Sequence, residues 1–458
     1  MTMHTFQRMT EVQAPASELF AWHAREGAFD RLSPPWERVQ VVGRQGTIRD
    51  GDSIDLEIKL GPVPVRWRAI HRDFVDGHQF CDTQEGGPFR YWKHVHRLEA
   101  NGEGATLHED ISYRLPVAPF GDWFAGSTVT GKLDRLFTYR HRTTRDDLAA
   151  HTRFLNHKRL NVWMSGRSGL VGAKLAPMLT TGGHTVDPIL RDHDGSQEDP
   201  TWRLPETDCD AVVHLAGESI DGRWTPEKKG RIARSRIAGT DRLVKSLLSL
   251  ARKPSVFVCA SAIGYYGDRG DERLDESASQ GDGFLSEVCQ EWETATRPLA
   301  DAGVRVVHAR FGVVVSANGG ALARMLTPFR LGGGGPIGTG NQYMSWVAID
   351  DAIGAIHQVL MDDGVSGPVN VVSPNPVTNR AFAKTLGKVL ARPAVRPLPS
   401  FAARVAFGEM ADALLLSSAR CVPDKLNTCA YTFRYPELED ALRFQLGKIP
   451  RSARAEEA

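Results

Sequence analysis

The chain has 458 residues, of which 41% are hydrophobic and 24% charged, and this composition excludes a largely disordered or collagen-like protein. Lysine and arginine together number 56 against 55 acidic residues, and a net charge of +1 gives no support for nucleic-acid binding. No stretch approaches the roughly 18 apolar residues of a membrane span, and the first residues lack a signal-peptide pattern. The six cysteines show neither a CxxC pair nor a zinc-site spacing. We expect a soluble, cytoplasmic protein of about three domains, with its oligomeric state left open.

Residues 1–150 contain short stretches in which polar and apolar side chains alternate, separated by Asp-Gly and Asn-Gly pairs. This alternation predicts antiparallel strands joined by hairpins. The expected strands cover 53–58, 65–70, 92–98 and 105–113. A helix that starts near Pro15 and a long helix over 124–148 bracket these strands, so an α+β domain is expected.

From residue 160 onward, apolar runs alternate with helical stretches, which predicts a parallel sheet with helices on both faces. The runs lie at 186–190, 211–215, 256–260 and 304–309. The fold class is therefore α/β, a doubly wound Rossmann-type sheet, followed by a small helical C-terminal region. The expected domains are 1–150, 158–397 and 398–448.

A glycine-rich loop with the spacing Gly-x-x-Gly-x-x-Gly follows the apolar run that starts at Asn161. Gly166 permits the tight turn, Gly169 lets the backbone approach a pyrophosphate, and Gly172 allows close helix–strand packing. An ordinary strand–helix turn is the alternative. The expected cofactor contacts in this loop are Gly166, Arg167, Ser168, Gly169, Leu170 and Val171.

Two arginines bear on the choice of cofactor. The second strand is expected to end at Arg191, where an acid would favour a free 2′-hydroxyl and an arginine suits a 2′-phosphate. Arg167 carries a second guanidinium in reach of that phosphate, whereas Asp192, next to Arg191, is an acid and argues for a free 2′-hydroxyl. Solvated surface charges are the alternative for both arginines, and NADP is favoured over NAD.

Three motifs together resemble the extended short-chain dehydrogenase/reductase superfamily: the glycine loop, His214-Leu215-Ala216-Gly217, and the stretch 261–267. Residues 216–220, Arg223-Trp224, 328–335, 345–351, 407–410 and 422–426 resemble one atypical subgroup, labelled nucleoside-diphosphate-sugar epimerases, whose C-terminal domain has no known role. This resemblance covers residues 160–446. It implies further cofactor contacts at Leu215, Ala216, Gly217 and Ser261.

Residues 1–150 resemble a START-like (polyketide cyclase/lipid-transport) domain, a helix-grip fold with an internal cavity. The resemblance rests on the order of elements and on 34–36, 87–89 and 94–96. It implies an apolar small-molecule ligand, with Trp22, Trp36, Trp67 and Trp92 as wall residues or, alternatively, as ordinary aromatic core.

The superfamily's usual reaction needs a tyrosine acid/base and a lysine four residues later. When 284–293 is placed on that helix, Leu285 takes the tyrosine position and Cys289 the lysine position. The partner serine falls on Ala262, or on Ser261 after a one-residue shift. The usual catalytic pair is therefore absent.

The candidate catalytic residues are Ser261 and Tyr265, with Tyr265 as a replacement acid. The candidate substrate contacts are Glu218, Arg223, Trp224 and Tyr266; a loop salt bridge for the first two and core packing for one of the tyrosines are the alternatives. Cys289 reads as a small buried residue rather than a nucleophile. His94 and His96 share a strand face, but no third ligand is visible, so no metal site is expected.

Two functions fit these residues. The first is an NADP-binding oxidoreductase or epimerase-like enzyme that acts on a small molecule, with an N-terminal domain that holds an apolar ligand. The second is a binding protein that senses NADP(H) and a ligand without turnover.

Overall fold

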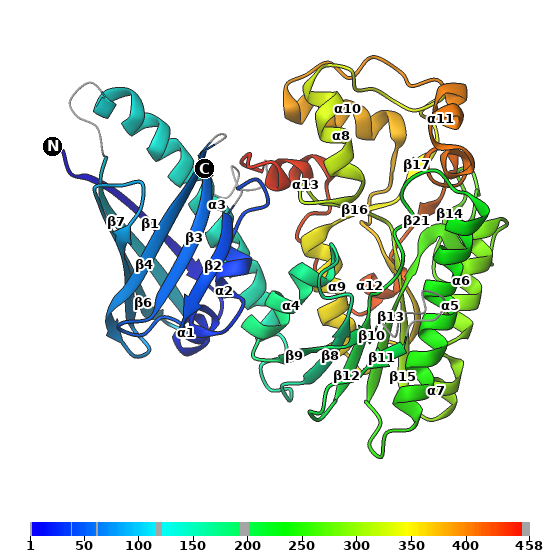
Figure 1. Ribbon diagram of the computed structural model, residues 1–458, viewed down its shortest axis with the longest axis horizontal. Coiled ribbons are helices and arrows are strands. Elements are labelled where there is room, and N and C mark those ends of the chain that lie inside the picture. The colour runs from blue at the N-terminus through cyan, green and yellow to red at the C-terminus, as the bar shows by residue number, and fades with distance from the viewer. Residues whose placement is uncertain (1, 38, 61–62, 116–120, 193–200, 451–458) are drawn as a thin grey trace.

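The computed structural model describes residues 2–37, 39–60, 63–115, 121–192 and 201–450. The molecule is elongated, with an antiparallel sheet in one half and a parallel sheet in the other (Figure 1). The order of the first sheet is β1-β7-β6-β5-β4-β3-β2. Its strands are β1 (His4–Val12), β2 (Val39–Gln45), β3 (Ser53–Leu60), β4 (Val63–Val75), β5 (Gln79–Gly86), β6 (Tyr91–Asn101) and β7 (Gly104–Arg114).

Helices cover one face of this sheet. They are α1 (Ala16–Ala24), α2 (Ala28–Leu32) and the long α3 (Gly121–Thr152). In β6 and β7 buried and less buried residues alternate, as expected for strands with one face against a core. Phe137 of α3 meets Phe6 of β1 at a ring-centroid distance of 5.2 Å, so α3 closes the domain over the sheet.

The second sheet is parallel, with the order β19-β15-β13-β12-β8-β9. Its strands are β8 (Asn161–Ser165), β9 (Thr185–Pro188), β12 (Ala211–His214), β13 (Val256–Ala262), β15 (Arg305–Phe311) and β19 (Gly367–Val371). The central strands β12 and β13 are buried along almost their whole length, which explains why they read as continuous apolar runs. Reversal of the strand order between β8 and β12 places a crevice at the carboxyl edge, where open α/β sheets bind ligands.

Helices lie on both faces of the parallel sheet (Figure 1). One face carries α4 (Gly172–Thr181) and α9 (Ile349–Met361), and the other carries α5 (Pro226–Leu248), α6 (Phe284–Thr294) and α7 (Arg297–Asp301). Helices α8 (Gly320–Arg330) and α10 (Asn379–Leu390) share a separate core with the C-terminal region. Short elements complete this half: β10 (Leu190–Asp192), β11 (Thr201–Arg203), a 3-10 turn η1 (Ile263–Tyr266), β14 (Arg273–Leu274), β16 (Val313–Val315), β17 (Tyr343–Met344), β18 (Trp346–Ala348) and β20 (Val377–Thr378).

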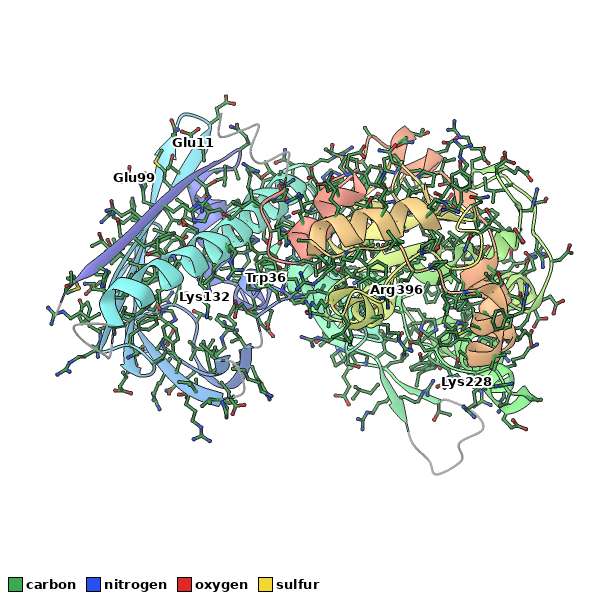
Figure 2. All side chains as sticks on the ribbon, turned by 90° about the horizontal axis from the view of Figure 1, so that it is seen from above. Glu11, Trp36, Glu99, Lys132, Lys228 and Arg396 are labelled. Atoms are coloured by element: carbon green, nitrogen blue, oxygen red, sulfur yellow. The ribbon has the colours of Figure 1, made fainter. Side chains whose placement is uncertain are left out.

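The C-terminal region contains α11 (Ser400–Phe407), a π-helical turn η2 (Ala411–Leu416), β21 (Arg420–Cys421), α12 (Asp424–Thr428) and α13 (Leu438–Gln445). It shares its core with both halves. Phe444 of α13 stacks on Tyr139 of α3 at 4.9 Å and packs with α8 and α10. Trp36, at the junction of the two halves, meets Tyr139 edge-on (Figure 2).

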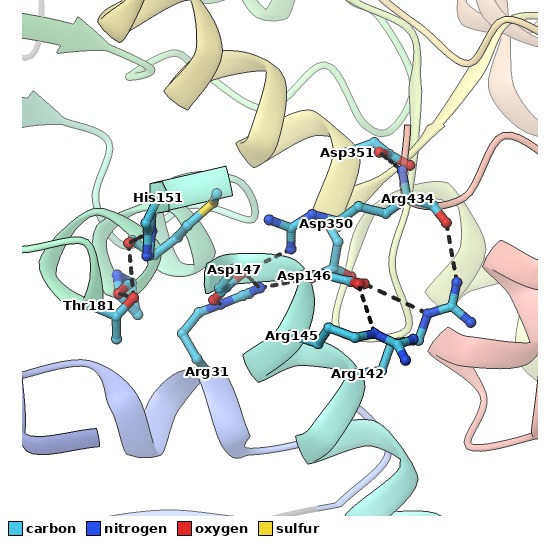
Figure 3. A network of polar contacts seen from close by, with 12 residues as sticks. Arg31, Arg142, Arg145, Asp146, Asp147, His151, Thr181, Asp350, Asp351 and Arg434 are labelled. Atoms are coloured by element: carbon cyan, nitrogen blue, oxygen red, sulfur yellow. Dashed lines mark hydrogen bonds and ion pairs between the residues drawn. The ribbon is translucent and has the colours of Figure 1, made fainter. Parts of the chain in front are cut away.

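A buried polar network joins the two halves (Figure 3). Asp147 of α3 accepts two hydrogen bonds from Arg31 of α2, at 2.7 and 2.8 Å, and one from Arg434 at 2.8 Å. Arg31 also reaches Asp350 at the start of α9, at 3.2 Å. Arg31 and Asp147 are at most 1% exposed. An isolated charge would be very costly at this depth, so each partner depends on the others.

The fold class and most central strands agree with the prediction from the sequence. Strands β1, β2 and β5, in which no clean alternation stands out, were not predicted, and neither was β19 at the edge of the parallel sheet. The second parallel strand is shorter than predicted, because β9 ends at Pro188 and Arg191 lies in the separate β10–β11 hairpin. Among the described residues, no helix combines the length and apolar character that a membrane crossing needs.

Candidate functional site

The glycine loop after β8 forms a tight cradle at the carboxyl edge of the sheet. Gly166 has a φ of +73°, and a Cβ there would lie 2.7 Å from the carbonyl carbon of Leu215. A Cβ on Gly172 would lie 2.2 Å from the Gly166 carbonyl oxygen. Neither position accepts a side chain without backbone movement. The N-terminus of α4 follows without a side-chain cap, and a helix N-terminus of this kind favours a bound phosphate.

A cavity of about 400 Å³ opens beside this loop. Arg167 and Ser168 line it from the loop, and Ala216 lines it from the end of β12. Arg191 and Trp202 of the β10–β11 hairpin form the far wall, with the Arg191 guanidinium carbon 5.8 Å from the Trp202 ring centroid. The other lining residues are Gly166, Pro188, Ile189 and Leu190.

The remaining loop positions pack rather than line the cavity. Leu170, Val171 and Leu215 lie against the hydrophobic core of the sheet. Gly169 closes the turn, since its N–H donates to the Gly166 carbonyl oxygen at 3.0 Å. Gly217 lies over Arg236, whose guanidinium carbon would be 3.3 Å from a Cβ at that position.

Ser261 at the end of β13 belongs to a buried chain of hydrogen bonds. Its hydroxyl donates to Glu293 of α6 at 2.7 Å. Arg310 of β15 donates two hydrogen bonds to Glu293, at 2.8 and 2.7 Å, and a third to the Tyr266 hydroxyl at 3.0 Å. The Tyr266 hydroxyl in turn donates to Asn370 at 2.7 Å.

Tyr265 and Tyr266 differ in their surroundings. Tyr266 is fully buried, and burial raises the pKa of its phenol although Arg310 opposes this. It therefore has the packing role that the sequence left open for one of the pair. Tyr265 is half-buried, the Arg310 guanidinium carbon lies 3.5 Å from its ring centroid, and no described residue hydrogen-bonds its hydroxyl.

Helix α6 brings Leu285 and Cys289 next to this site. A Cβ on Gly264, in η1, would lie 3.2 Å from the Leu285 Cβ and 3.9 Å from the Cys289 Sγ. Burial, followed by the charge of Glu293, raises the pKa of Cys289 to about 11. The thiol is therefore not a thiolate nucleophile near neutral pH.

The candidate substrate residues lie on the loop after β12. Glu218 binds Lys228 at 2.7 Å and lies 3.6 Å from Arg231. Trp224 is buried against Ile232 and Met410, with its indole N–H on the Ile220 carbonyl oxygen at 2.8 Å. Arg223 reaches the Val405 carbonyl oxygen of α11 at 3.4 Å. The loop is therefore tied to the C-terminal region, and a salt bridge occupies Glu218.

Glu293, Arg310 and Asn370 were not predicted from the sequence as members of the site. A charged residue at the end of an apolar strand run was the available signal for Arg310, which directly follows 304–309. Asn370 carried no signal, because it meets Tyr266 only after β19 pairs with β15. In the N-terminal half, His94 and His96 lie near Asp82, a third side chain of a metal-ligating type that the sequence did not reveal.

Three known families match successive parts of the chain. The NAD dependent epimerase/dehydratase family matches residues 162–372. The polyketide cyclase/dehydrase and lipid transport family matches 12–136, and a domain of unknown function, DUF1731, matches 398–445.

Known proteins resemble both the second half and the whole chain. The epimerase family protein Mb2239 of Mycobacterium bovis is 40% identical over 293 residues, which are 62% of this chain and 96% of that protein. The nucleoside-diphosphate sugar epimerase of Corynebacterium glutamicum has a TM-score of 0.79 at 32% identity, over 99% of this chain and 92% of that one. The human epimerase family protein SDR39U1, solved with NADPH, has a TM-score of 0.58 at 33% identity, over 63% of this chain and 99% of that one. Because such relatives are matched over nearly their full length and share the Rossmann-like sheet, the chain belongs to the epimerase family of NAD(P)-binding short-chain dehydrogenase/reductase proteins, with a polyketide-cyclase-family domain at its N-terminal side.

Proposed function

We propose that this protein is an NADP-dependent oxidoreductase or epimerase-like enzyme that acts on a small molecule. The observation that carries the proposal is the cavity of about 400 Å³ lined by Arg167, Arg191 and Trp202. Two guanidinium groups beside a phosphate-binding loop suit the extra 2′-phosphate of NADP. The human relative solved with NADPH supports the same choice.

Each part of the site has a proposed task. The glycine loop and the N-terminus of α4 hold the pyrophosphate, with Gly166, Ser168 and Gly169 nearest to it. Trp202 and Ile189 provide apolar walls for the adenine end. A bound nicotinamide cofactor would supply hydride-transfer chemistry, and residues along the path from the loop to the end of β13 would hold it. Leu215, Ala216, Gly217 and Ser261 are the proposed contacts along that path.

Tyr265 is the proposed proton donor. The Ser261 proton is committed to Glu293, whereas the Tyr265 hydroxyl has no hydrogen-bond partner among the described residues. The guanidinium of Arg310 against the Tyr265 ring would stabilise negative charge that develops on the phenol during proton transfer. Ser261 then has a positioning task, because Glu293 and Arg310 fix its hydroxyl.

Glu218 and Arg223 are the proposed substrate-side residues, because both are partly open to solvent on a loop that follows a strand end. Trp224 would support that loop by packing against Ile232 and Met410. For the N-terminal domain we propose an apolar ligand. The family match and the aromatic cluster of Trp67, Trp92 and Phe89 support this assignment.

The test is NADPH oxidation with a broad panel of carbonyl compounds and sugar nucleotides. Tyr265→Phe should lower kcat by a factor of roughly 10² to 10⁴ with little change in NADPH affinity, since the phenol acts in the transition state. Tyr91→Phe, at an exposed tyrosine of the other half, is the matched control and should retain wild-type kcat. An unchanged kcat in Tyr265→Phe removes Tyr265 from the chemistry.

A second candidate function is a sensor that binds NADP(H) and a ligand without turnover. Leu285 and Cys289 favour it, because neither replaces the usual tyrosine–lysine pair. Tight NADPH binding without hydride transfer to any member of the panel would select this function over the enzyme.

A further inference from the structure

Four titratable side chains meet on the inner face of the antiparallel sheet. Asp82 of β5 lies directly opposite His94 of β6, and Glu109 of β7 lies opposite His96. Cross-strand partners share one face of a sheet, and so do residues two apart on the same strand. The four side chains therefore lie close together at the corners of a square. His141 of α3 contacts Glu109 and covers the cluster on the side of that helix.

Three ligand atoms of this square converge. The Asp82 Oδ2 lies 3.2 Å from the His94 Nδ1 and 3.6 Å from the His96 Nε2, and all three atoms lie within 4.8 Å of one another. Ligands of a tetrahedral zinc ion with bonds of about 2.0 to 2.1 Å are roughly 3.3 Å apart. The two contacts of Asp82, at 3.2 and 3.6 Å, are close to that spacing.

The opposite nitrogens of the same two rings face a second carboxylate. The Glu109 Oε1 lies 3.1 Å from the His96 Nδ1 and 3.6 Å from the His94 Nε2. The other carboxylate oxygen, Oε2, is held by the His141 Nε2 at 2.5 Å. Metal-binding histidines nearly always present their second nitrogen to such a carboxylate, which fixes the tautomer and the orientation of the ring.

Burial makes this arrangement costly without a further partner. His94, His96, Glu109 and His141 are each at most 6% exposed. The His94 Nε2 and the His96 Nδ1 face Glu109 without meeting the geometry of a hydrogen bond, whereas a metal on the opposite nitrogens would leave each ring an N–H to present to that carboxylate. The cluster is therefore incomplete as a hydrogen-bond network.

We propose that Asp82, His94 and His96 bind one divalent transition-metal ion of the zinc type, with Glu109 and His141 as the outer carboxylate and its support. Two imidazoles and one carboxylate favour such an ion over Ca²⁺ or Mg²⁺, which prefer oxygen ligands. Three protein ligands leave a coordination position for water or for a ligand inside the N-terminal domain. In the part of the chain that the structure describes, no other group of three His, Cys, Asp or Glu side chains brings its ligand atoms this close together.

A proton on His94 is the alternative to a metal ion for balancing the negative charge of the Asp82 and Glu109 carboxylates. Burial alone would lower the pKa of His94, but Asp82 and then Glu109 raise it to about 9. Arg140 of α3, which is half-buried, also places a positive charge near Glu109 and Asp82. A metal and a proton are therefore alternatives at the same nitrogen, and direct measurement of metal decides between them.

The experiment uses the full chain without a polyhistidine tag, stripped with a chelator and dialysed against Zn²⁺. We expect one zinc per chain by elemental analysis, and zinc-edge X-ray absorption should show two imidazole nitrogens at about 2.0 to 2.1 Å. The absorption measurement needs no variant, so it decides the proposal even if the variants fail to fold. Fewer than two imidazoles, or no zinc uptake, overturns it.

Variants then test the assigned roles. His96→Gln and Asp82→Asn should abolish stoichiometric zinc, whereas Glu109→Gln should weaken affinity by about 10- to 100-fold. His108→Gln is the matched control, because His108 lies on the same strand as Glu109 with its side chain one-third exposed, and it should bind zinc as the wild type does. Wild-type zinc binding in folded His96→Gln and Asp82→Asn would also overturn the proposal.

Discussion

The two halves of the molecule build their polar sites in opposite ways. At the edge of the parallel sheet, backbone geometry over seven consecutive residues, 166–172, makes the cradle, and the side chains that line it are partly exposed. Inside the antiparallel sheet, five side chains from β5, β6, β7 and α3 meet in a buried cluster. A site made of backbone can be recognised in a short motif, whereas a site made of side chains from distant strands requires the strand register.

The largest effect on the free energy of unfolding is expected in the buried network that joins the two halves. Asp147→Asn removes the carboxylate that Arg31 and Arg434 share, and both guanidinium groups then stay buried without it. Breaking a buried ion pair typically costs about 3–5 kcal/mol, so we expect a loss of that size in the free energy of unfolding. Urea denaturation followed by tryptophan fluorescence measures it.

The matched control for that variant is Arg297→Ala. Arg297 and Asp301 form an exposed ion pair at 3.9 Å, and such pairs contribute about 0–1 kcal/mol. An equal loss in both variants would show that burial does not set the strength of the network between the halves.

The next effect concerns the cradle. Gly166→Ala places a Cβ against the backbone of Leu215 and Ala216 at a positive φ. Overpacking costs about 1–3 kcal/mol, so NADPH affinity should fall by about 10- to 100-fold in calorimetric titration. Gly131→Ala, on α3 with nothing within 4 Å of the added Cβ, should bind NADPH as the wild type does. Unchanged affinity in Gly166→Ala would mean that the loop is not the phosphate cradle.

A smaller effect is expected from pH. Burial, helped by Arg159 and Arg25, lowers the pKa of His184 to about 4, below its ordinary value of about 6.5. The folded protein therefore binds fewer protons than the unfolded chain between these values. The stability that the neutral imidazole contributes is complete above about pH 6.5 and is lost as the pH falls towards 4.

His184→Asn removes that proton linkage and retains an acceptor for the Leu160 N–H, which donates to the His184 Nδ1 at 3.0 Å. The stability difference between wild type and variant should shift by up to about 1.4 kcal/mol per pH unit in this window. Denaturation at pH 7, 6, 5 and 4 measures it, and His108→Asn, at a partly exposed histidine, serves as the control. Parallel profiles for wild type and His184→Asn would contradict the expectation.

The same contrast explains what could be predicted from the sequence. The cradle was visible because Gly166, Gly169 and Gly172 are close in sequence and each has a steric reason to be glycine. The absence of the tyrosine–lysine pair could also be read locally, from Leu285 and Cys289 on one helix. Arg310 and Asn370 were missed because their partners, Glu293 on α6 and Tyr266 in η1, are distant in sequence and meet them only in the folded sheet.

The N-terminal site shows the limit most clearly. Alternation placed His94 and His96 on one face of a strand, and the expected strand 92–98 lies within β6. The third proposed ligand, Asp82, lies on β5. This strand was not predicted, so the sequence could not show that Asp82 pairs with His94 of β6. Trp36 was grouped with the cavity tryptophans, yet it packs on Tyr139 at the junction with the C-terminal region.

We propose that Arg167 and Arg191 make the crevice of the parallel sheet an NADP site. Calorimetric titration of the full chain with NADPH and with NADH tests it most directly. We predict that NADPH binds at least about tenfold more tightly than NADH, a difference of about 1.4 kcal/mol in binding free energy. Arg191→Ala should reduce this difference. Equal affinities, or tighter binding of NADH by the wild type, would contradict the claim.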